Sequence, residues 1–173
     1  MRHIITGGSG FTGSVLTQRL LDKGQEVINI DIREQPNMAL RQNVHFVHGD
    51  VTNSDTLKKL CLREDDVVYH LAARQFADAV PKTSREEWFN EVNVCGTKVV
   101  VDEMKNTGCH KLVFFSTDMT YGIPTVCPVP PSHPQNPLGP YGNSKILAER
   151  IIRGENSIDA TIFRPRLITG PGR

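Results

Sequence analysis

A tyrosine and a lysine four residues apart, Tyr141 and Lys145, have types and spacing that suit acid–base chemistry. A free tyrosine has a pKa of about 10 and is a poor base at neutral pH. A nearby ammonium group lowers that pKa, and residues four apart on a helix share one face. Such a tyrosine can take a proton from a hydroxyl while hydride leaves the carbon, or return a proton to a ketone. By itself the pair is also compatible with an ordinary helix surface.

The glycine-rich segment from Thr6 to Gly13 lies between a predicted strand and a predicted helix. A chain that binds a pyrophosphate here must turn sharply and start a helix packed close to the sheet. Both requirements favour residues without a Cβ atom, and the helix N-terminus directs N–H groups at the phosphates. The residues expected to hold the cofactor are Gly7, Gly10, Phe11, Thr12 and Gly13. The alternative is a glycine-rich turn without a ligand.

An acidic residue, Asp31, ends the second predicted strand, where its carboxylate can accept hydrogen bonds from an adenosine ribose. Together with the glycine turn, this position indicates a dinucleotide-binding site. The alternative is an aspartate that only caps the strand. A carboxylate would repel a 2′-phosphate, so the sequence favours NAD over NADP. Arg33 weakens this preference, because an arginine can bind the 2′-phosphate.

Strands and helices alternate along the chain. Apolar spacing and cap residues predict strands at 2–6, 26–32, 44–48, 67–73, 111–116 and 160–163, and helices at 12–23, 53–60, 84–106 and 141–153. Ser84 to Glu87 form a capping-box pattern that opens the longest helix, and Gly108 ends it. The proline-rich stretch 123–140 predicts an ordered surface loop, because so many fixed φ angles exclude a helix or an inner strand.

This alternation predicts an α/β fold of Rossmann type, a doubly wound parallel sheet of about six strands with helices on both faces. A chain of 173 residues with 38% hydrophobic and 23% charged residues suits one domain over 1–173 and excludes a disordered chain. Lysine and arginine number 20 against 19 acidic residues, so neither nucleic acid nor an anionic membrane is expected as the partner. The apolar stretches are too short to span a bilayer.

Cysteine and histidine usage bears on compartment and metal binding. The four cysteines form no Cys-x-x-Cys pair, so we expect free thiols in a reducing, cytoplasmic environment. His45 and His48 are three apart in a predicted strand and therefore face opposite sides of it. No metal site is expected.

Taken together, the motifs resemble those of the extended short-chain dehydrogenase/reductases, the NAD-dependent epimerase/dehydratase group. The resemblance covers essentially the whole chain. It rests on several ordered motifs: Thr6 to Gly13, Gly49-Asp50-Val51, His70-Leu71-Ala72-Ala73, Asn93 with Gly96-Thr97, Phe115-Ser116-Thr117-Asp118 with Tyr121-Gly122, Tyr141 to Lys145 with Ala148-Glu149, and Arg164-Pro165 with Gly170-Pro171-Gly172.

The resemblance implies a catalytic trio. Thr117 would hydrogen-bond the reacting oxygen, Tyr141 would be the acid or base, and Lys145 would hold the nicotinamide ribose and tune Tyr141. The implied activity is NAD-dependent oxidation, reduction or epimerisation at a secondary alcohol or ketone of a small molecule, nucleotide sugars included. An epimerase and a dehydrogenase share this trio, so the sequence does not separate them. A non-catalytic NAD-binding module is the alternative from another class.

The resemblance also assigns cofactor contacts beyond the glycine turn. Asp50 would bind the adenine amino group, with Val51 beside the ring. The segment Leu71, Ala72 and Ala73 would line the cofactor path after the fourth strand. Asn93 would stiffen the site from the long helix, although an amide that only packs that helix is an equal alternative.

Two departures from the family pattern limit the substrate assignment. Met119 follows Asp118 where sugar-nucleotide dehydratases commonly have Asp-Glu, and a methionine cannot transfer the proton that removal of water requires. Leu167 stands three residues after Arg164, where many sugar-nucleotide epimerases have an asparagine. The second departure makes the chain look closer to hydroxysteroid-dehydrogenase-like and general reductase branches.

A third departure is length. Family members continue well beyond this chain, and the further residues supply most of the substrate pocket. We therefore expect a fragment that lacks the C-terminal substrate domain and has no useful turnover alone. The full-length enzyme is expected to be a homodimer, in which the helices at 84–106 and 141–153 pack against their copies.

Overall fold

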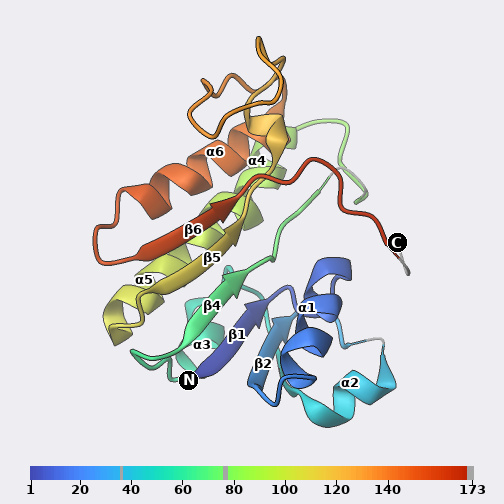
Figure 1. The fold of residues 1–173 in the computed structure, drawn as a ribbon, viewed down its shortest axis with the longest axis vertical. Coiled ribbons are helices and arrows are strands. Elements are labelled where there is room, and N and C mark those ends of the chain that lie inside the picture. The colour runs from blue at the N-terminus through green and yellow to red at the C-terminus, as the bar shows by residue number, and fades with distance from the viewer. Residues whose placement is uncertain (36, 76–77, 171–173) are drawn as a thin grey trace.

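The computed structural model describes residues 1–35, 37–75 and 78–170 (Figure 1). It confirms the predicted fold class, because six parallel strands form one sheet in the order β3-β2-β1-β4-β5-β6. The order reverses between β1 and β4, which is where open α/β sheets bind their ligands. The strands are β1 (Arg2–Thr6), β2 (Glu26–Asp31), β3 (His45–His48), β4 (Val67–His70), β5 (Lys111–Phe115) and β6 (Asp159–Phe163).

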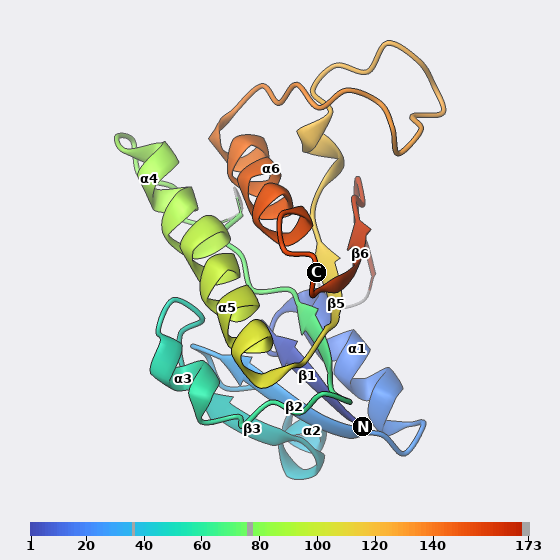
Figure 2. The same cartoon turned by 90° about the vertical axis from the view of Figure 1, so that its left-hand side faces the viewer.

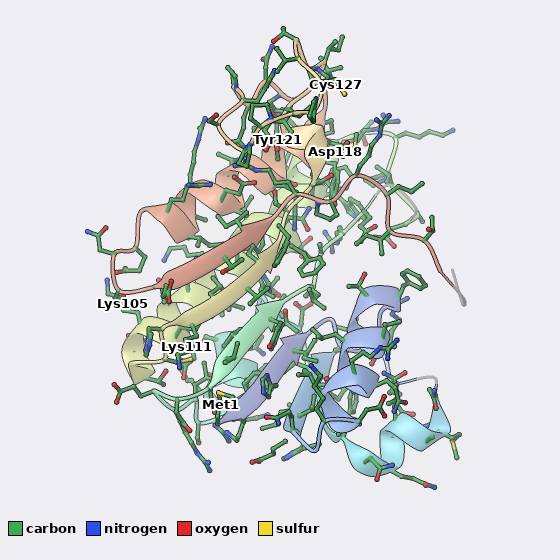
Figure 3. All side chains as sticks on the ribbon, in the orientation of Figure 1. Met1, Lys105, Lys111, Asp118, Tyr121 and Cys127 are labelled. Atoms are coloured by element: carbon green, nitrogen blue, oxygen red, sulfur yellow. The ribbon has the colours of Figure 1, made fainter. Side chains whose placement is uncertain are left out.

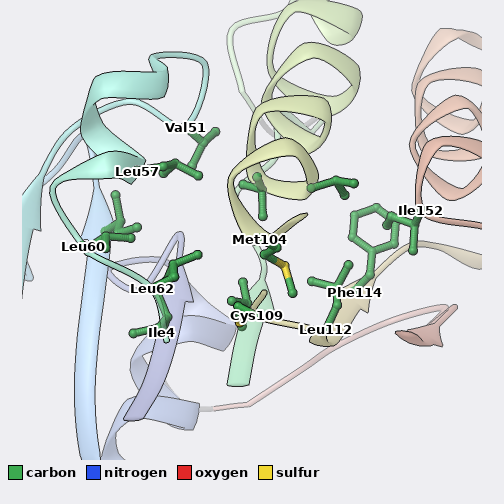
Figure 4. Close-up of a cluster of buried hydrophobic side chains, with 14 of the residues drawn as sticks. Ile4, Val51, Leu57, Leu60, Leu62, Met104, Cys109, Leu112, Phe114 and Ile152 are labelled. Carbon is green, nitrogen blue, oxygen red and sulfur yellow. The ribbon is translucent and has the colours of Figure 1, made fainter. Parts of the chain in front are cut away.

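Helices cover both faces of the sheet. α1 (Phe11–Leu21) and α2 (Met38–Asn43) lie on one side, and α3 (Ser54–Lys58), α5 (Thr97–Thr107) and α6 (Pro140–Arg153) lie on the other (Figure 2). Successive side chains of β1 point to opposite faces of the sheet and contribute to both hydrophobic cores. Ile4 belongs to the larger core, and Ile5 belongs to the smaller core beneath α1. The larger core joins α3, α5 and α6 to the strands through residues such as Leu57, Met104 and Ile152 (Figure 4).

The long helix predicted from residue 84 is present but is not uniform. α4 (Arg85–Asn90) continues through a π-helical segment, η1 (Glu91–Gly96), into α5, and Gly108 ends the helix in the left-handed conformation as expected. The predicted capping box is wrong: Ser84 has a φ of 53° and, within residues 78–170, makes no side-chain hydrogen bond to the helix. The sequence analysis did not predict the π segment, which is a rare variant of the helix.

The remaining differences are local. Helix α2 and the short 3₁₀ helix η2 (Asp118–Thr120) have no counterpart in the prediction. The sequence predicts a strand with its exit turn over 67–73, and β4 does end at His70, with residues 71–73 following as the exit segment. Residues 121–139 contain no helix or strand, which confirms the loop expected from the prolines. Pro171 and Gly172 of the last family motif lie outside the described residues. In the part of the chain that the structure describes, no helix has the length and apolarity that crossing a membrane requires.

Candidate active site

The glycine-rich turn is packed tightly between β1, β2 and α1. The Gly7 N–H donates to the Ile30 carbonyl at 2.8 Å, which ties the start of the turn to β2. A Cβ atom on Gly13 would lie 2.3 Å from the Gly7 oxygen, and one on Gly8 would lie 2.4 Å from Asn29 Cγ. Only glycine fits at these two positions, so the turn brings the helix close to the sheet as the sequence predicts.

The N-terminus of α1 has the properties of an anion site. Gly10 precedes the helix and has no side chain with which to cap it, and its carbonyl accepts the N–H of Ser14 at 2.9 Å. The N–H groups of Phe11, Thr12 and Gly13 precede that bond, at the positive end of the helix dipole. The first turn carries no acidic residue. These properties fit the pyrophosphate of a dinucleotide.

Asp31 lies beside this turn with a buried side chain. Its Oδ2 accepts the backbone N–H of Ser9 and its Oδ1 accepts that of Arg33, both at 3.0 Å. The aspartate therefore caps the strand end, and a carboxylate with one donor on each oxygen retains acceptor capacity for ribose hydroxyls. The sequence reasoning missed Gln35, which is buried and donates to the Gly8 carbonyl at 3.2 Å.

The residues expected near adenine lie at the same edge of the sheet, after β3. Asp50 is exposed, and its Oδ1 accepts both the N–H and the hydroxyl of Thr52, at 2.8 and 2.9 Å. Val51 is buried against the π segment, because a Cβ on Gly96 would lie 2.9 Å from its Cγ2. Their contact with adenine stays a prediction.

The segment after β4 runs directly beside the glycine turn. The N–H of Leu71 donates to the Thr6 carbonyl at 3.1 Å, and that of Ala72 donates to Thr6 Oγ1 at 3.3 Å. A Cβ on Gly7 would lie 2.7 Å from the Ala72 nitrogen. Leu71, Ala72 and the partly buried Ala73 thus stand at the switch point of the sheet.

The three residues predicted to be catalytic come from two parts of the chain that are packed together. Thr117 is buried directly after β5, and its Oγ1 accepts the Met119 N–H at 3.3 Å. A Cβ on Gly142 would lie 2.8 Å from the Met119 oxygen, so the first turn of α6 rests on η2. This contact brings Tyr141 to the end of β5. Asp118 and Tyr121 mark that end, far from Lys111 at the start of the strand (Figure 3).

The environment of Tyr141 raises its pKa instead of lowering it. Burial is the largest cause, the carboxylates of Asp118 and Asp78 add to it, and the pKa reaches about 12. Lys145, one turn further along α6, has its Nζ 4.4 Å from the ring centroid of Phe114. Its own burial lowers the pKa of Lys145 to about 7. In the chain alone, Tyr141 is therefore a neutral phenol at neutral pH, and the tuning by Lys145 that the resemblance implies stays a prediction.

Asn93 connects the π segment to the catalytic helix. Its Oδ1 accepts the Arg74 N–H at 2.8 Å, and its Nδ2 donates to the Arg74 carbonyl at 3.1 Å and to Ser144 Oγ at 2.9 Å. Ser144 in turn donates to the Tyr141 carbonyl at 2.7 Å. These contacts pack the helix of Asn93 and also fix the turn of α6 that carries Tyr141. The same contacts are therefore compatible with both alternatives for Asn93, stiffening of the site and packing of its own helix.

His70 has a structural role that the sequence analysis did not assign to it. Its Nδ1 lies 2.7 Å from Thr6 Oγ1 and its Nε2 lies 3.0 Å from Thr97 Oγ1. Burial lowers the pKa of His70 to about 3, so the ring is neutral. Thr97 donates to the Asn93 carbonyl at 2.7 Å, which extends the chain of bonds to the π segment. The only signal in the sequence is a histidine at the end of a strand.

The comparisons with known proteins agree with this geometry. The family model described as "NAD dependent epimerase/dehydratase family" matches residues 3–173. The UDP-glucose 4-epimerase of Streptomyces lividans is 34% identical over 158 residues, which cover 89% of this chain and 47% of that protein. The chain spans about half the length of the curated relatives it matches.

Two solved structures illustrate the match. The dTDP-glucose 4,6-dehydratase DesIV of Streptomyces venezuelae, a double mutant with NAD bound, is 29% identical with a TM-score of 0.82 and covers 95% of this chain and 55% of its own. The enzyme WbmG of Bordetella bronchiseptica, in complex with NAD and UDP, is 26% identical with a TM-score of 0.80 and covers 95% of this chain and 52% of its own. The chain belongs to the NAD-dependent epimerase/dehydratase family.

The packing of the glycine turn yields a first prediction. Gly13→Ala should lower the free energy of unfolding by about 1–3 kcal/mol, because the new methyl group would overlap backbone atoms that cannot move independently. Gly139→Ala is the control, since a Cβ there meets nothing within 4 Å, and its effect should stay below about 1 kcal/mol. Urea denaturation measures both. Equal midpoints for the two variants would contradict the packing argument.

Proposed function

We propose that this chain is the cofactor-binding half of an NAD-dependent enzyme that acts on a secondary alcohol of a nucleotide sugar. Its reaction is hydride transfer assisted by Tyr141 and Lys145. The observation that carries the proposal is the packing of the first turn of α6, which carries Tyr141, on η2, the short helix that directly follows Thr117. The names of the relatives, UDP-glucose 4-epimerase and an enzyme crystallised with UDP, support a nucleotide sugar as the substrate class.

The cofactor would lie along the carboxyl edge of the sheet. The N-terminus of α1 would hold the pyrophosphate, Asp31 the adenosine ribose, and Asp50 the adenine. Bound NAD supplies the hydride acceptor. The segment 71–73 would pass beside the cofactor on its way to the reacting end, since it already lies against the glycine turn.

The protein would supply the groups that bind the substrate oxygen and accept its proton. Thr117 would hydrogen-bond the substrate oxygen, and Tyr141 would accept its proton as the hydride leaves. Because burial and two carboxylates hold the pKa of Tyr141 at about 12, the phenolate needs a cation close by. Lys145 would provide this cation once its ammonium faces the ribose and the phenol.

Among the reactions of this family we favour epimerisation, in which the oxidised sugar rotates in the site and is then reduced on its other face. Dehydration is disfavoured because Met119 cannot transfer a proton. A hydroxysteroid-dehydrogenase-like reductase is the second candidate, on the observation that Leu167, an exposed apolar residue, stands where many sugar-nucleotide epimerases have an asparagine. All three members of the trio are present, which argues against a non-catalytic module.

Cofactor binding is the direct test. We expect isothermal titration calorimetry to give NAD binding that is stronger than NADP binding. Asp31→Asn should weaken NAD binding by roughly 10-fold or more, because hydrogen bonds to a charged acceptor are lost. Asp102→Asn, on the exposed face of α5, is the matched control. Absence of NAD binding at millimolar concentration would contradict the proposal.

The role of Tyr141 is tested in a protein long enough to hold the substrate. Tyr141→Phe should keep cofactor affinity and lose roughly 10²- to 10⁴-fold in turnover, since it removes a proton transfer. Tyr69→Phe, which removes a phenol that bonds His3 in the smaller core region, is the control. We expect the 173-residue chain to show no useful turnover, because it spans about half the length of the curated relatives it matches and would position the substrate poorly. Equal turnover by Tyr141→Phe and wild type would remove Tyr141 from the mechanism.

We also propose a homodimer formed through α4, η1, α5 and α6. A groove of about 250 Å³ runs between α4 and α6, and Leu147 on its wall is 37% exposed. Val100 and Met104 of α5 belong to the core, so they are not part of this surface. The cytoplasmic location stays a prediction.

Light scattering should give the full-length protein twice its monomer mass, and Leu147→Glu should reduce that mass to the monomer value, because it places a charge in the shared surface. Met38→Glu, at an exposed residue of α2, is the control and should leave the dimer intact. A monomeric mass for the unaltered protein would exclude this interface.

A further inference from the structure

Lys145 and Glu149 are four residues apart on α6, a spacing at which a lysine and a glutamate usually pair. In the structure, Glu149 forms its ion pair with a different cation. Arg164, just after β6, donates from Nε to Oε1 at 2.9 Å and from its second terminal nitrogen to Oε2 at 2.5 Å. This bidentate pair is buried on both sides, because the two side chains are 10% and 1% exposed.

The remaining acceptor positions of Glu149 are also filled. Ser116 Oγ donates to Oε1 at 2.5 Å and Gln135 Nε2 donates to Oε2 at 3.1 Å. A carboxylate has about four lone-pair positions, so no place is left for an ammonium group. Burial alone would raise the pKa of Glu149, but the bonds from Arg164, Ser116 and Gln135 hold it below its usual value. These four hydrogen bonds occupy both carboxylate oxygens of Glu149, and Arg153 Nε also lies 4.0 Å from Oε2.

Lys145 is left as a buried cation without a counterion. Its side chain is 2% exposed, its Nζ lies over Phe114, and it forms no ion pair among the residues that the structure describes. Burial lowers the pKa of Lys145 to about 7, and the charge of Glu149 opposes this shift. The group thus changes charge near neutral pH.

The neighbouring groups do not titrate in the same range. His70, from β4, feels the charge of Lys145 and stays neutral with a pKa of about 3. Tyr141, one turn before Lys145, stays neutral with a pKa of about 12. Arg164 behind Glu149 stays charged, because its pKa is raised by the bond to Glu149. Asp118, from η2, acts on Tyr141.

We propose that Arg164 is a positioning residue that, by occupying Glu149, reserves the ammonium of Lys145 for the cofactor, so that NAD binding is accompanied by uptake of one proton from solvent onto Lys145 Nζ. The inference rests on the proposed function. The ribose hydroxyls of NAD would supply hydrogen-bond acceptors to the ammonium of Lys145, which Glu149 does not supply. Apart from the bond between Nζ and the added proton, no covalent bond forms or breaks. If Arg164 is removed, Glu149 becomes the nearest counterion, and Lys145 is already charged before the cofactor arrives.

The coupling between NAD binding and protonation of Lys145 determines how proton uptake and NAD affinity change with pH. With a free-state pKa of about 7 and a bound state that stays protonated, uptake should be about 0.1 proton at pH 6, half a proton at pH 7 and about 0.9 at pH 8. The dissociation constant for NAD should rise about tenfold from pH 6 to pH 8, because the free state increasingly lacks the proton that the bound state requires.

Calorimetry with NAD in two buffers of different ionisation enthalpy measures both quantities. In Arg164→Gln the tenfold pH effect should shrink to less than about threefold, because the exposed charge of Glu149 keeps Lys145 protonated. The double variant Arg164→Gln with Glu149→Gln should restore the wild-type pH effect, since it removes that charge. A role of Arg164 in folding alone would not be reversed by the second substitution. Failure of the double variant to restore the effect, or zero proton uptake by the wild type at pH 8, would overturn the proposal.

A measurement without cofactor separates this inference from the proposed function. The carbon-13 signal of Lys145 Cε, identified by its loss in Lys145→Met, should titrate near pH 7 in the wild type and at least one pH unit higher in Arg164→Gln. Titration of the wild-type signal at the ordinary lysine value of about 10.4 would overturn the inference even if NAD binds. If Arg164→Gln does not fold, Glu149→Gln replaces it, and its signal should titrate at or below the wild-type value. A midpoint well above the wild type in that variant would count against the inference.

Discussion

The candidate site depends on one buried chain of hydrogen bonds that crosses the sheet from β1 to α6. It begins at Thr6, beneath the glycine turn, and passes through His70 and Thr97 to the π segment, where Asn93 continues it to Ser144. Each of these side chains is buried, so a missing partner would leave a polar group without water or protein to satisfy it. The requirement for complete pairing fixes the position of α6 relative to the phosphate-binding turn. The turn and the catalytic helix are thereby parts of one rigid arrangement rather than two neighbouring features.

Among the described residues of the site, Lys145 forms no ion pair, and its Nζ lies over the ring of Phe114. The carboxylate of Glu149, four residues after Lys145, accepts hydrogen bonds from Arg164, Ser116 and Gln135, which lie just after β6, just after β5 and in the proline-rich loop. That loop is held in turn by Arg164, which also donates to the Pro131 carbonyl at 3.0 Å. Arg164 therefore bonds both Glu149 and the proline-rich loop. Structure and reactivity are coupled here because a buried carboxylate accepts a limited number of donors.

Several parts of the site were predictable because they are local. The order of strands and helices follows from apolar periodicity, and the glycine turn follows from the close approach of α1 to the sheet, which a Cβ on Gly13 would prevent. The position of Asp31 at the end of β2 follows from the same pattern. The π segment, helix α2 and the uncapped start of α4 at Ser84 were not predictable, because tertiary contacts outweigh weak local preferences there.

The sequence by itself determined the fold class, the family and the identity of the residues at the carboxyl edge, since these depend on spacing and on steric limits that operate over a few residues. Only the tertiary structure decided the electrical state of those residues. Tyr141 has a raised pKa and Lys145 a lowered one because burial removes the water that would stabilise each charged form. Glu149 pairs with Arg164 and not with the lysine four residues before it, because β6 delivers a planar, bidentate donor to both carboxylate oxygens at once.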